Sequence, residues 1–284
     1  MQVVKSISEL RNLIQDAKKG DHSVGFVPTM GALHEGHLSL VKESKKNCDL
    51  TVVSIFVNPT QFAPTEDLDK YPRNIELDTE MLTSVGVDIL FFPSKEEIYP
   101  PGASTFVNVE KITEAFEGAI RPTHFRGVAT VVSALFNIVQ PDRAFFGQKD
   151  LQQVAVIKQM VRDLHFPIEI EVVETTRESD GLAMSSRNRY LSHEERAESL
   201  ILSKTLFQVR DHLLAGLPLA EAKLRGIKFF GSLKKKAVLE YLDIVDPETF
   251  QFAESFKPSE ELGVVIAARI GATRLIDNIL VKAK

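Results

Sequence analysis

The chain has 284 residues, a formal net charge of −5 and 44% hydrophobic residues, which is typical of a globular protein with one large or two modest domains. The acidic balance disfavours bulk nucleic-acid binding, and no apolar run approaches the roughly 20 residues that a membrane helix needs. Cys48 is the sole cysteine, and the N-terminus lacks a signal-peptide pattern. We therefore expect a cytoplasmic protein that binds neither nucleic acid nor membranes.

Apolar runs alternate with helical patterns through the first 176 residues. Ser6 and Glu9 form a capping-box pattern that predicts a helix ending near Gly20. The expected strands cover residues 24–27, 50–57, 88–92, 144–146 and 168–173, and the expected helices cover residues 36–46, 75–84, 127–139 and 150–161. This alternation predicts an α/β fold with a Rossmann-like, doubly wound parallel sheet, in which ligands bind at the carboxyl ends of the strands.

The pattern changes after about residue 176. One long charged helix is expected from His193 to about Leu214, ended by Gly216 and Pro218. Three strand-like runs follow, at residues 237–245, 262–267 and 275–279. We therefore expect a Rossmann-like N-terminal domain over residues 1–176 and a smaller α+β C-terminal domain over residues 177–284.

Residues 28–38 (Pro-Thr-Met-Gly-Ala-Leu-His-Glu-Gly-His-Leu) lie between a predicted strand and a predicted helix. Gly31 and Gly36 allow a ligand to approach the backbone closely, and the helix N-terminus offers unpaired N–H groups to an anion. His34 and His37, three residues apart, project from one turn. The segment predicts a nucleotide triphosphate site. A pair of surface histidines is the alternative, and zinc would need a third ligand.

Two further segments carry groups suited to phosphates. Residues 147–150 (Gly-Gln-Lys-Asp) repeat the arrangement of strand, glycine and helix start, so that Lys149 can supply a charge and Asp150 a cap or a sugar contact. The alternative is a plain N-cap beside a solvated lysine. Residues 184–187 (Met-Ser-Ser-Arg) carry two hydroxyls and a guanidinium in a polar, mobile-looking stretch. They suit a gate over substrate, or else an ordinary interdomain loop.

Other polar side chains follow predicted strands or begin predicted helices. Gln61, in the loop that starts at Asn58, and Gln153 can each donate to and accept from a hydroxy acid, although either glutamine by itself indicates a surface residue. Residues 121–127, with two arginines and a histidine, suit a binding loop or a subunit contact. Asp78 suits a phosphate-bound magnesium ion, although its residue type alone indicates a solvated helix acid.

These clusters, in this order, resemble the pantothenate synthetase family, the pantoate–β-alanine ligases of the nucleotidyltransferase-like α/β superfamily. His34-Glu35-Gly36-His37 is similar to the superfamily's His-x-Gly-His element. Residues 181–188 are similar to its mobile Lys-Met-Ser-Lys-Ser loop. The matching segments are residues 28–37, 56–62, 69–73, 146–150, 181–188, 241–247 and 273–278.

The resemblance implies ATP-dependent condensation of (R)-pantoate with β-alanine through a pantoyl adenylate, which yields pantothenate, AMP and pyrophosphate, and it suggests a homodimer. The catalytic groups that it implies, together with Mg²⁺, are His34, His37, Lys149, Ser185, Ser186 and Arg187. The further ATP contacts that it implies are Met30, Gly31, Gly147, Gln148, Asp150, Thr176 and Met184. The pantoate and β-alanine contacts are Gln61, Gln153, Asn58, Tyr71, Arg121 and His124, and the magnesium ligand is Asp78.

Three questions stay open at the level of sequence. His37 suits either a proton donor or a neutral imidazole N–H donor, because the helix N-terminus opposes imidazolium while phosphate favours it. A nucleotidyltransferase that acts on a phosphate ester is one alternative function, although its acceptor site would need more cations. A nucleotide sensor or a fragment of an aminoacyl-tRNA synthetase is the other, and the acidity of the chain argues against tRNA.

Overall fold

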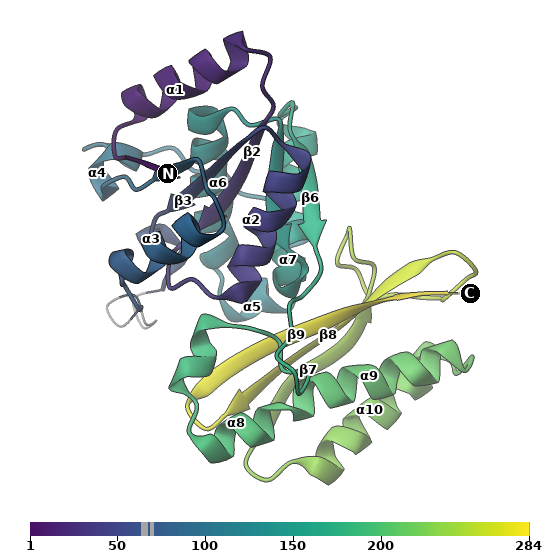
Figure 1. Cartoon of the computed structure of the whole chain (residues 1–284). Coiled ribbons are helices and arrows are strands. Elements are labelled where there is room, and N and C mark those ends of the chain that lie inside the picture. The colour runs from purple at the N-terminus through teal and green to yellow at the C-terminus, as the bar shows by residue number, and fades with distance from the viewer. Residues whose placement is uncertain (64–67, 69–70, 284) are drawn as a thin grey trace. The chain divides into compact units, whose positions relative to one another are not determined.

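The computed structural model describes residues 1–63, 68 and 71–283. Pro64, which we expected in a loop, and the first two residues of the 69–73 segment lie outside the described residues. The chain forms two compact units, one of residues 1–147 with 156–173 and the other of residues 148–155 with 174–284. Each unit is built on its own β-sheet (Figure 1).

The first unit contains a six-stranded parallel sheet in the order β1-β4-β3-β2-β5-β6, which confirms the predicted doubly wound fold. Its strands are β1 (Gln2–Val4), β2 (Val24–Thr29), β3 (Leu50–Ile55), β4 (Ile89–Phe91), β5 (Arg143–Gly147) and β6 (Glu169–Val173). Its helices are α1 (Ile7–Lys19), α2 (Glu35–Asn47), the 3-10 turn η1 (Pro59–Gln61), α3 (Ile75–Ser84), α4 (Lys95–Ile98), α5 (Glu117–Ile120) and α6 (His124–Val139). Strand β1, which we did not predict, pairs with β4.

The strand order places a topological switch point between β2 and β5. From β2 the chain proceeds to β3 and β4 on one side, and β5 then pairs with the other edge of β2. Helix α2 packs closely against β2 at Gly25, where an added Cβ would lie 2.2 Å from Ser44 Oγ. Since ligands of such sheets bind at the carboxyl ends of the strands beside the switch point, the residues that follow β2 are placed for binding.

Helix α7 (Leu151–Asp163) and the preceding 3-10 turn η3 (Gln148–Asp150) form one continuous stretch of chain. Residues 148–155 of this stretch belong to the second unit, and the rest of α7 belongs to the first.

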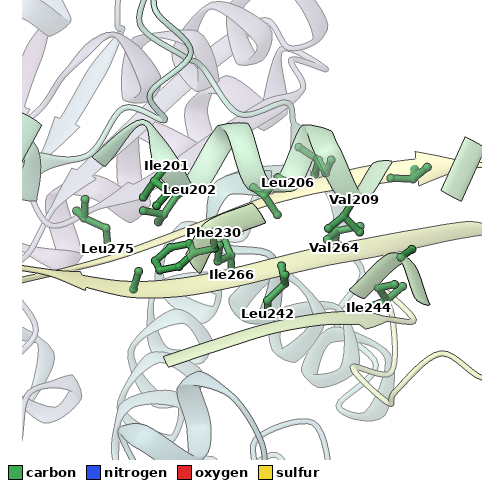
Figure 2. Close-up of a cluster of buried hydrophobic side chains, with 14 of the residues drawn as sticks. Ile201, Leu202, Leu206, Val209, Phe230, Leu242, Ile244, Val264, Ile266 and Leu275 are labelled. Atoms are coloured by element: carbon green, nitrogen blue, oxygen red, sulfur yellow. The ribbon is translucent and has the colours of Figure 1, made fainter. Parts of the chain in front are cut away.

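The second unit contains an antiparallel sheet in the order β7-β8-β9, formed by β7 (Val238–Val245), β8 (Glu261–Ile270) and β9 (Thr273–Lys282). Its helices are the 3-10 helix η4 (Ser186–Tyr190), α8 (His193–Ser199), α9 (Ile201–Leu214) and α10 (Leu219–Leu233). Figure 2 shows the core, in which Leu206 and Val209 of α9 lie over side chains of the sheet such as Val264. The predicted α+β character of this region is confirmed.

The single long helix expected from His193 to Leu214 is wrong, because the structure divides it at Leu200 into α8 and α9. Ser199, fully buried, donates its hydroxyl to the Arg196 carbonyl at 2.7 Å. Such local hydrogen bonds compete with the helical ladder. Helix α10 was also missed, although Pro218 at its N-cap is a helix-start signal as well as a terminator.

None of the helices in the described part of the chain is long and apolar enough to span a membrane.

Candidate functional site

The two histidines that follow β2 cap helix α2 reciprocally. His34 is the N-cap, and its Nδ1 accepts the Gly36 N–H at 3.2 Å. His37 Nδ1 accepts the His34 N–H at 3.3 Å, so that two of the helix's otherwise unpaired donors are satisfied. The rings lie 4.1 Å apart, centroid to centroid. A neutral imidazole that accepts at Nδ1 carries its proton on Nε2, so this geometry favours two Nε2–H donors.

The loop between β2 and α2 adopts an unusual backbone that Asp78 holds in place. Gly31 and Ala32 have φ values of +80° and +52°, in the left-handed region that residues with a Cβ seldom adopt. The Asp78 carboxylate accepts the N–H of Ala32 at 2.9 Å and that of Leu33 at 2.8 Å. Asp78 therefore fixes the loop that delivers His34 to its capping position.

The alternative that residue type alone indicated for Asp78, a solvated helix acid, is wrong, since Asp78 is only 3% exposed. Both of its oxygens accept backbone hydrogen bonds, which favours a role in shaping the loop over one in holding a metal ion. Among the residues that the structure describes, no three His, Cys, Asp or Glu side chains are grouped so as to bind a metal. Its magnesium role stays a prediction.

Gln61 lies at the end of η1, 7% exposed, in a network of amides. Its Oε1 accepts from Asn58 Nδ2 at 3.0 Å, and its Nε2 lies 2.9 Å from the Met30 sulfur. Asn58 Oδ1 in turn accepts the Tyr99 hydroxyl at 2.9 Å and the Thr60 hydroxyl at 2.9 Å. These donors fix the orientation of the Asn58 amide, and Asn58 fixes that of Gln61.

Tyr99 was not among the residues expected at the site. It follows α4, and burial, only partly offset by its hydrogen bond with Thr60, raises the pKa of its phenol, so the hydroxyl stays a donor at neutral pH. Its contact with Asn58 joins positions 41 residues apart. No local pattern in the sequence indicates such a pairing.

The structure places the predicted loop at residues 121–127 beside Gln61. His124 Nδ1 lies 3.1 Å from the Gln61 carbonyl oxygen, and Arg121 Nη2 lies 3.5 Å from it. His124 is the first residue of α6, three residues earlier than the start we predicted. Tyr71 packs edge-on against Phe62, 5.9 Å between ring centroids, in an apolar cluster with Ala32. In the first unit, Met30, Asn58, Gln61, Arg121 and His124 thus form one connected group.

In the second unit, the turn η3 carries Lys149 and is held by Asn278 of β9. Asn278 Nδ2 donates to the carbonyl oxygens of Gln148 at 2.9 Å and Lys149 at 2.8 Å. Its Oδ1 accepts from Gln148 Nε2 at 3.2 Å. The Lys149 side chain is 19% exposed, and its Nζ lies 3.6 Å from Asp150 Oδ1. Gln153 follows in the first turn of α7.

Residues 176–187 form a hairpin and a 3-10 helix rather than an irregular loop. Arg177 and Ala183 form an antiparallel bridge, and the Met184 N–H donates to the Thr176 carbonyl at 3.0 Å. Ser185 is the N-cap of η4, and its hydroxyl accepts the N–H of Arg187 at 3.3 Å. Ser186 is the first residue of η4.

The model of the family described as "Pantoate-beta-alanine ligase" matches residues 2–280. The chain belongs to the pantoate–β-alanine ligase family. A pantothenate synthetase of Acetivibrio thermocellus is 50% identical over 282 residues, which cover 99% of this chain and 100% of that protein. Pantothenate synthetase 1 of Bradyrhizobium diazoefficiens is also 50% identical, over 99% of this chain and 98% of that protein.

Solved structures of this family share the fold. The pantothenate synthetase of Thermus thermophilus superposes with a TM-score of 0.92 at 45% identity, over 98% of this chain and 99% of that chain. The pantoate-beta-alanine ligase of Francisella tularensis, a complex with beta-gamma ATP and beta-alanine, has a TM-score of 0.79 at 35% identity, over 99% and 97% of the two chains.

Proposed function

We propose that this chain is a pantoate–β-alanine ligase, which condenses (R)-pantoate with β-alanine at the expense of ATP and passes through a pantoyl adenylate. Membership of the family over residues 2–280 carries this proposal. The neighbouring structure that holds beta-gamma ATP and beta-alanine supports two of the three substrates. The two histidines that cap α2 after β2 supply N–H donors that suit the phosphates of ATP.

In the first step a pantoate carboxylate oxygen attacks the α-phosphorus of ATP, and the bond to the β-phosphate breaks to release pyrophosphate. The carboxylate is already a nucleophile, so the step needs alignment and charge stabilisation rather than a base. We assign His34 and His37 to this task as neutral Nε2–H donors, because each Nδ1 accepts a backbone N–H. The cap geometry thus favours the neutral donor over the proton donor for His37.

The cationic groups are Lys149 and Arg187, in the segments at residues 147–150 and 184–187 that the resemblance to the family assigned to ATP. We assign Lys149 to the phosphates as a point charge, and Arg187 with the hydroxyls of Ser185 and Ser186 to the leaving pyrophosphate. The further ATP contacts that we propose are Met30, Gly31, Gly147, Gln148, Asp150, Thr176 and Met184. Thr176 would contribute through its backbone, as the resemblance to the family implies; its carbonyl oxygen also accepts the Met184 N–H.

Pantoate binding is assigned to the amides. The Gln61 Oε1 accepts from Asn58 and one Nε2 proton faces the Met30 sulfur, so we assign the second Nε2 proton to a pantoate oxygen. Gln153 is assigned to pantoate as well. Tyr71, Arg121 and His124 surround Gln61 or its loop and complete the proposed pantoate and β-alanine contacts.

In the second step the β-alanine amine attacks the acyl carbon of the adenylate, the bond to AMP breaks, and the amine loses a proton. Mg²⁺ would enter with the ATP phosphates, since this ion usually keeps several waters and needs only one or two protein carboxylates. We further propose a homodimer in the cytoplasm, as the resemblance to the family suggests.

The test is the acceptor dependence of pyrophosphate release. With ATP and Mg²⁺, we expect pyrophosphate when pantoate and β-alanine are present and none when a phosphorylated alcohol replaces pantoate. Pyrophosphate release that requires the phosphorylated acceptor and ignores pantoate would instead establish a nucleotidyltransferase. Tight ATP binding without turnover under either condition would indicate a nucleotide sensor.

A further inference from the structure

The segment at residues 273–278 stood out in the sequence, but the proposed chemistry gives it no task. Its last two residues, Asp277 and Asn278, lie on β9, an edge strand of the three-stranded sheet. They are 4% and 3% exposed, which is unusual for polar residues and requires that their hydrogen-bonding groups be satisfied.

The hydrogen-bonding partners of Asn278 require an asparagine at this position. Its amide nitrogen has two protons, and they go to the consecutive carbonyls of Gln148 and Lys149 at 2.9 and 2.8 Å. Its amide oxygen takes the Gln148 side chain at 3.2 Å. Among side chains of this length, only that of Asn carries two donor protons and an acceptor oxygen, so no other residue can make all three of these hydrogen bonds.

Asp277 holds a different segment through Arg177. The carboxylate and guanidinium form a two-point pair, with N–O distances of 2.7 and 2.9 Å, at side-chain exposures of 3% and 18%. The same guanidinium donates to the Gly181 carbonyl at 3.1 Å and to the Asn278 carbonyl at 3.1 Å. Gly181, with a φ of +95°, is at the tip of the hairpin that leads to residues 184–187.

Close packing against β8 also holds the residue that follows the turn η3. Leu151, which follows η3, lies against Gly263 of β8, where an added Cβ would be 3.0 Å from Leu151 Cδ2. The start of α7 is therefore seated on this sheet by close packing as well as by Asn278.

We propose that Asp277 and Asn278 are positioning residues for ATP: from two adjacent places on β9, Asn278 sets the turn that carries Lys149 and Asp277 sets the hairpin that leads to Arg187. The inference rests on the proposed function, since it gives Lys149 and Arg187 their phosphate roles. Because one rigid strand holds both segments, the two cations keep a fixed spacing, as charge stabilisation by preorganised groups requires.

The test compares Asn278→Asp with Val281→Ala. The first change is isosteric but replaces two donors by an oxygen that faces two carbonyl oxygens. The second removes buried volume from the same strand, at a residue 2% exposed and outside the proposed machinery. Melting midpoints of both variants are measured by circular dichroism, and kinetics are taken below them. Asn278→Ser, which keeps one donor, serves if Asn278→Asp does not fold.

We expect Asn278→Asp to raise the KM for ATP by about tenfold or more, because small misplacements of binding groups have effects of this size. Val281→Ala should leave that KM within about twofold at a similar melting midpoint, and the KM for β-alanine should change little in either variant. Equal effects of the two variants on the KM for ATP would overturn the inference, since the role of Asn278 would then be structural only.

A second readout tests whether Asn278 acts through Lys149. In a Lys149→Ala background, Asn278→Ser should weaken ATP binding, measured by titration calorimetry, much less than it does in the wild type. If Asn278→Ser weakens ATP binding by the same factor in both backgrounds, the two residues act independently and the inference is contradicted. Calorimetry needs no turnover: a wild type that binds ATP but releases no pyrophosphate would refute the proposed function and still allow this comparison. A wild type that does not bind ATP would refute both.

Discussion

The imidazole of His37 has a structural and a chemical task at once. Its Nδ1 accepts the His34 N–H at the start of α2, and its Nε2 carries the proton that we assign to the phosphates. His37→Ala removes both groups. We expect adenylation to fall by about a hundredfold or more, together with a loss of about 1 kcal/mol of stability from the missing cap.

His37→Glu separates the two tasks. Glutamate is favoured at this capping position and complements the helix dipole, so the melting midpoint should match or exceed that of the wild type. A carboxylate repels phosphate, so pyrophosphate release should fall at least as far as in His37→Ala. Near-normal release from either variant would refute the role of His37.

Tyr99 allows a milder test of the amide network. Tyr99→Phe removes one of the donors that orient Asn58, while the Thr60 hydroxyl still donates to the same oxygen. We expect the KM for pantoate to rise about threefold to tenfold, in line with the loss of about 1 kcal/mol for one hydrogen bond. The KM for ATP should not change, and a rise in the KM for ATP alone would contradict the assignment of Gln61 to pantoate.

Helix α6 and the turn η1 meet at a glycine. An added Cβ at Gly127 would lie 2.4 Å from the Thr60 carbonyl oxygen, and Asn58 Nδ2 donates to the Gly127 carbonyl at 3.1 Å. Gly127→Ala should push η1 away from α6, with a loss of about 1–3 kcal/mol in stability and a weaker affinity for pantoate. The measurements are the denaturation midpoint and the pantoate KM.

The matched control is Gly231→Ala in α10. A Cβ there would meet no atom within 4 Å, so the change should stabilise the helix by about 0.5–1 kcal/mol without affecting the kinetics. A Gly127→Ala variant that is as stable and as active as this control would contradict the packing that places Gln61.

The link between α10 and β7 is fixed by one carboxylate. Glu198 Oε1 accepts the N–H groups of three successive residues, 235–237, at 2.7, 2.7 and 2.8 Å. Burial alone would raise the pKa of Glu198, but these donors together lower it below its usual 4.5. A lowered pKa in the folded state means that the stabilisation is complete above about pH 4.5 and is lost as the pH falls through the lower, folded-state pKa.

Glu198→Gln should therefore lower the urea midpoint at pH 7, and the difference from the wild type should narrow as the pH falls below 4.5. The exposed Glu254, changed to Gln, is the control and should show no such difference. A gap between wild type and Glu198→Gln that is constant from pH 7 to pH 3 would contradict the charge-assisted role of Glu198.

At the scale of the whole chain, the sequence predicted every strand of the parallel sheet except β1, because β2 to β6 each contain a β-branched or apolar run. It could not predict that residues 148–155 pack with the second unit, since this depends on contacts such as that of Asn278 with residues 130 positions earlier. The sequence also did not predict the break between α8 and α9 at Leu200, which follows the buried Ser199.

The site shows the same division. The place of Gly31, His34 and His37 between β2 and α2 could be predicted because a strand, a glycine turn and a helix start are a local signature. The role of Asp78 could not, because its partners lie 45 and 46 residues away in a loop with left-handed backbone. The hairpin at residues 177–183 could not be predicted either, because no alternation of apolar and polar residues indicates the bridge between Arg177 and Ala183.

The acyl adenylate is the central claim, and a single-turnover experiment tests it most directly. Enzyme in excess over ATP is mixed with Mg²⁺ and pantoate, pyrophosphate is followed in time, and β-alanine is added later. We expect a burst of pyrophosphate equivalent to the ATP before β-alanine is present, with AMP and pantothenate released only after its addition. Pyrophosphate that appears only once β-alanine has been added would contradict a pantoyl adenylate formed from ATP and pantoate alone.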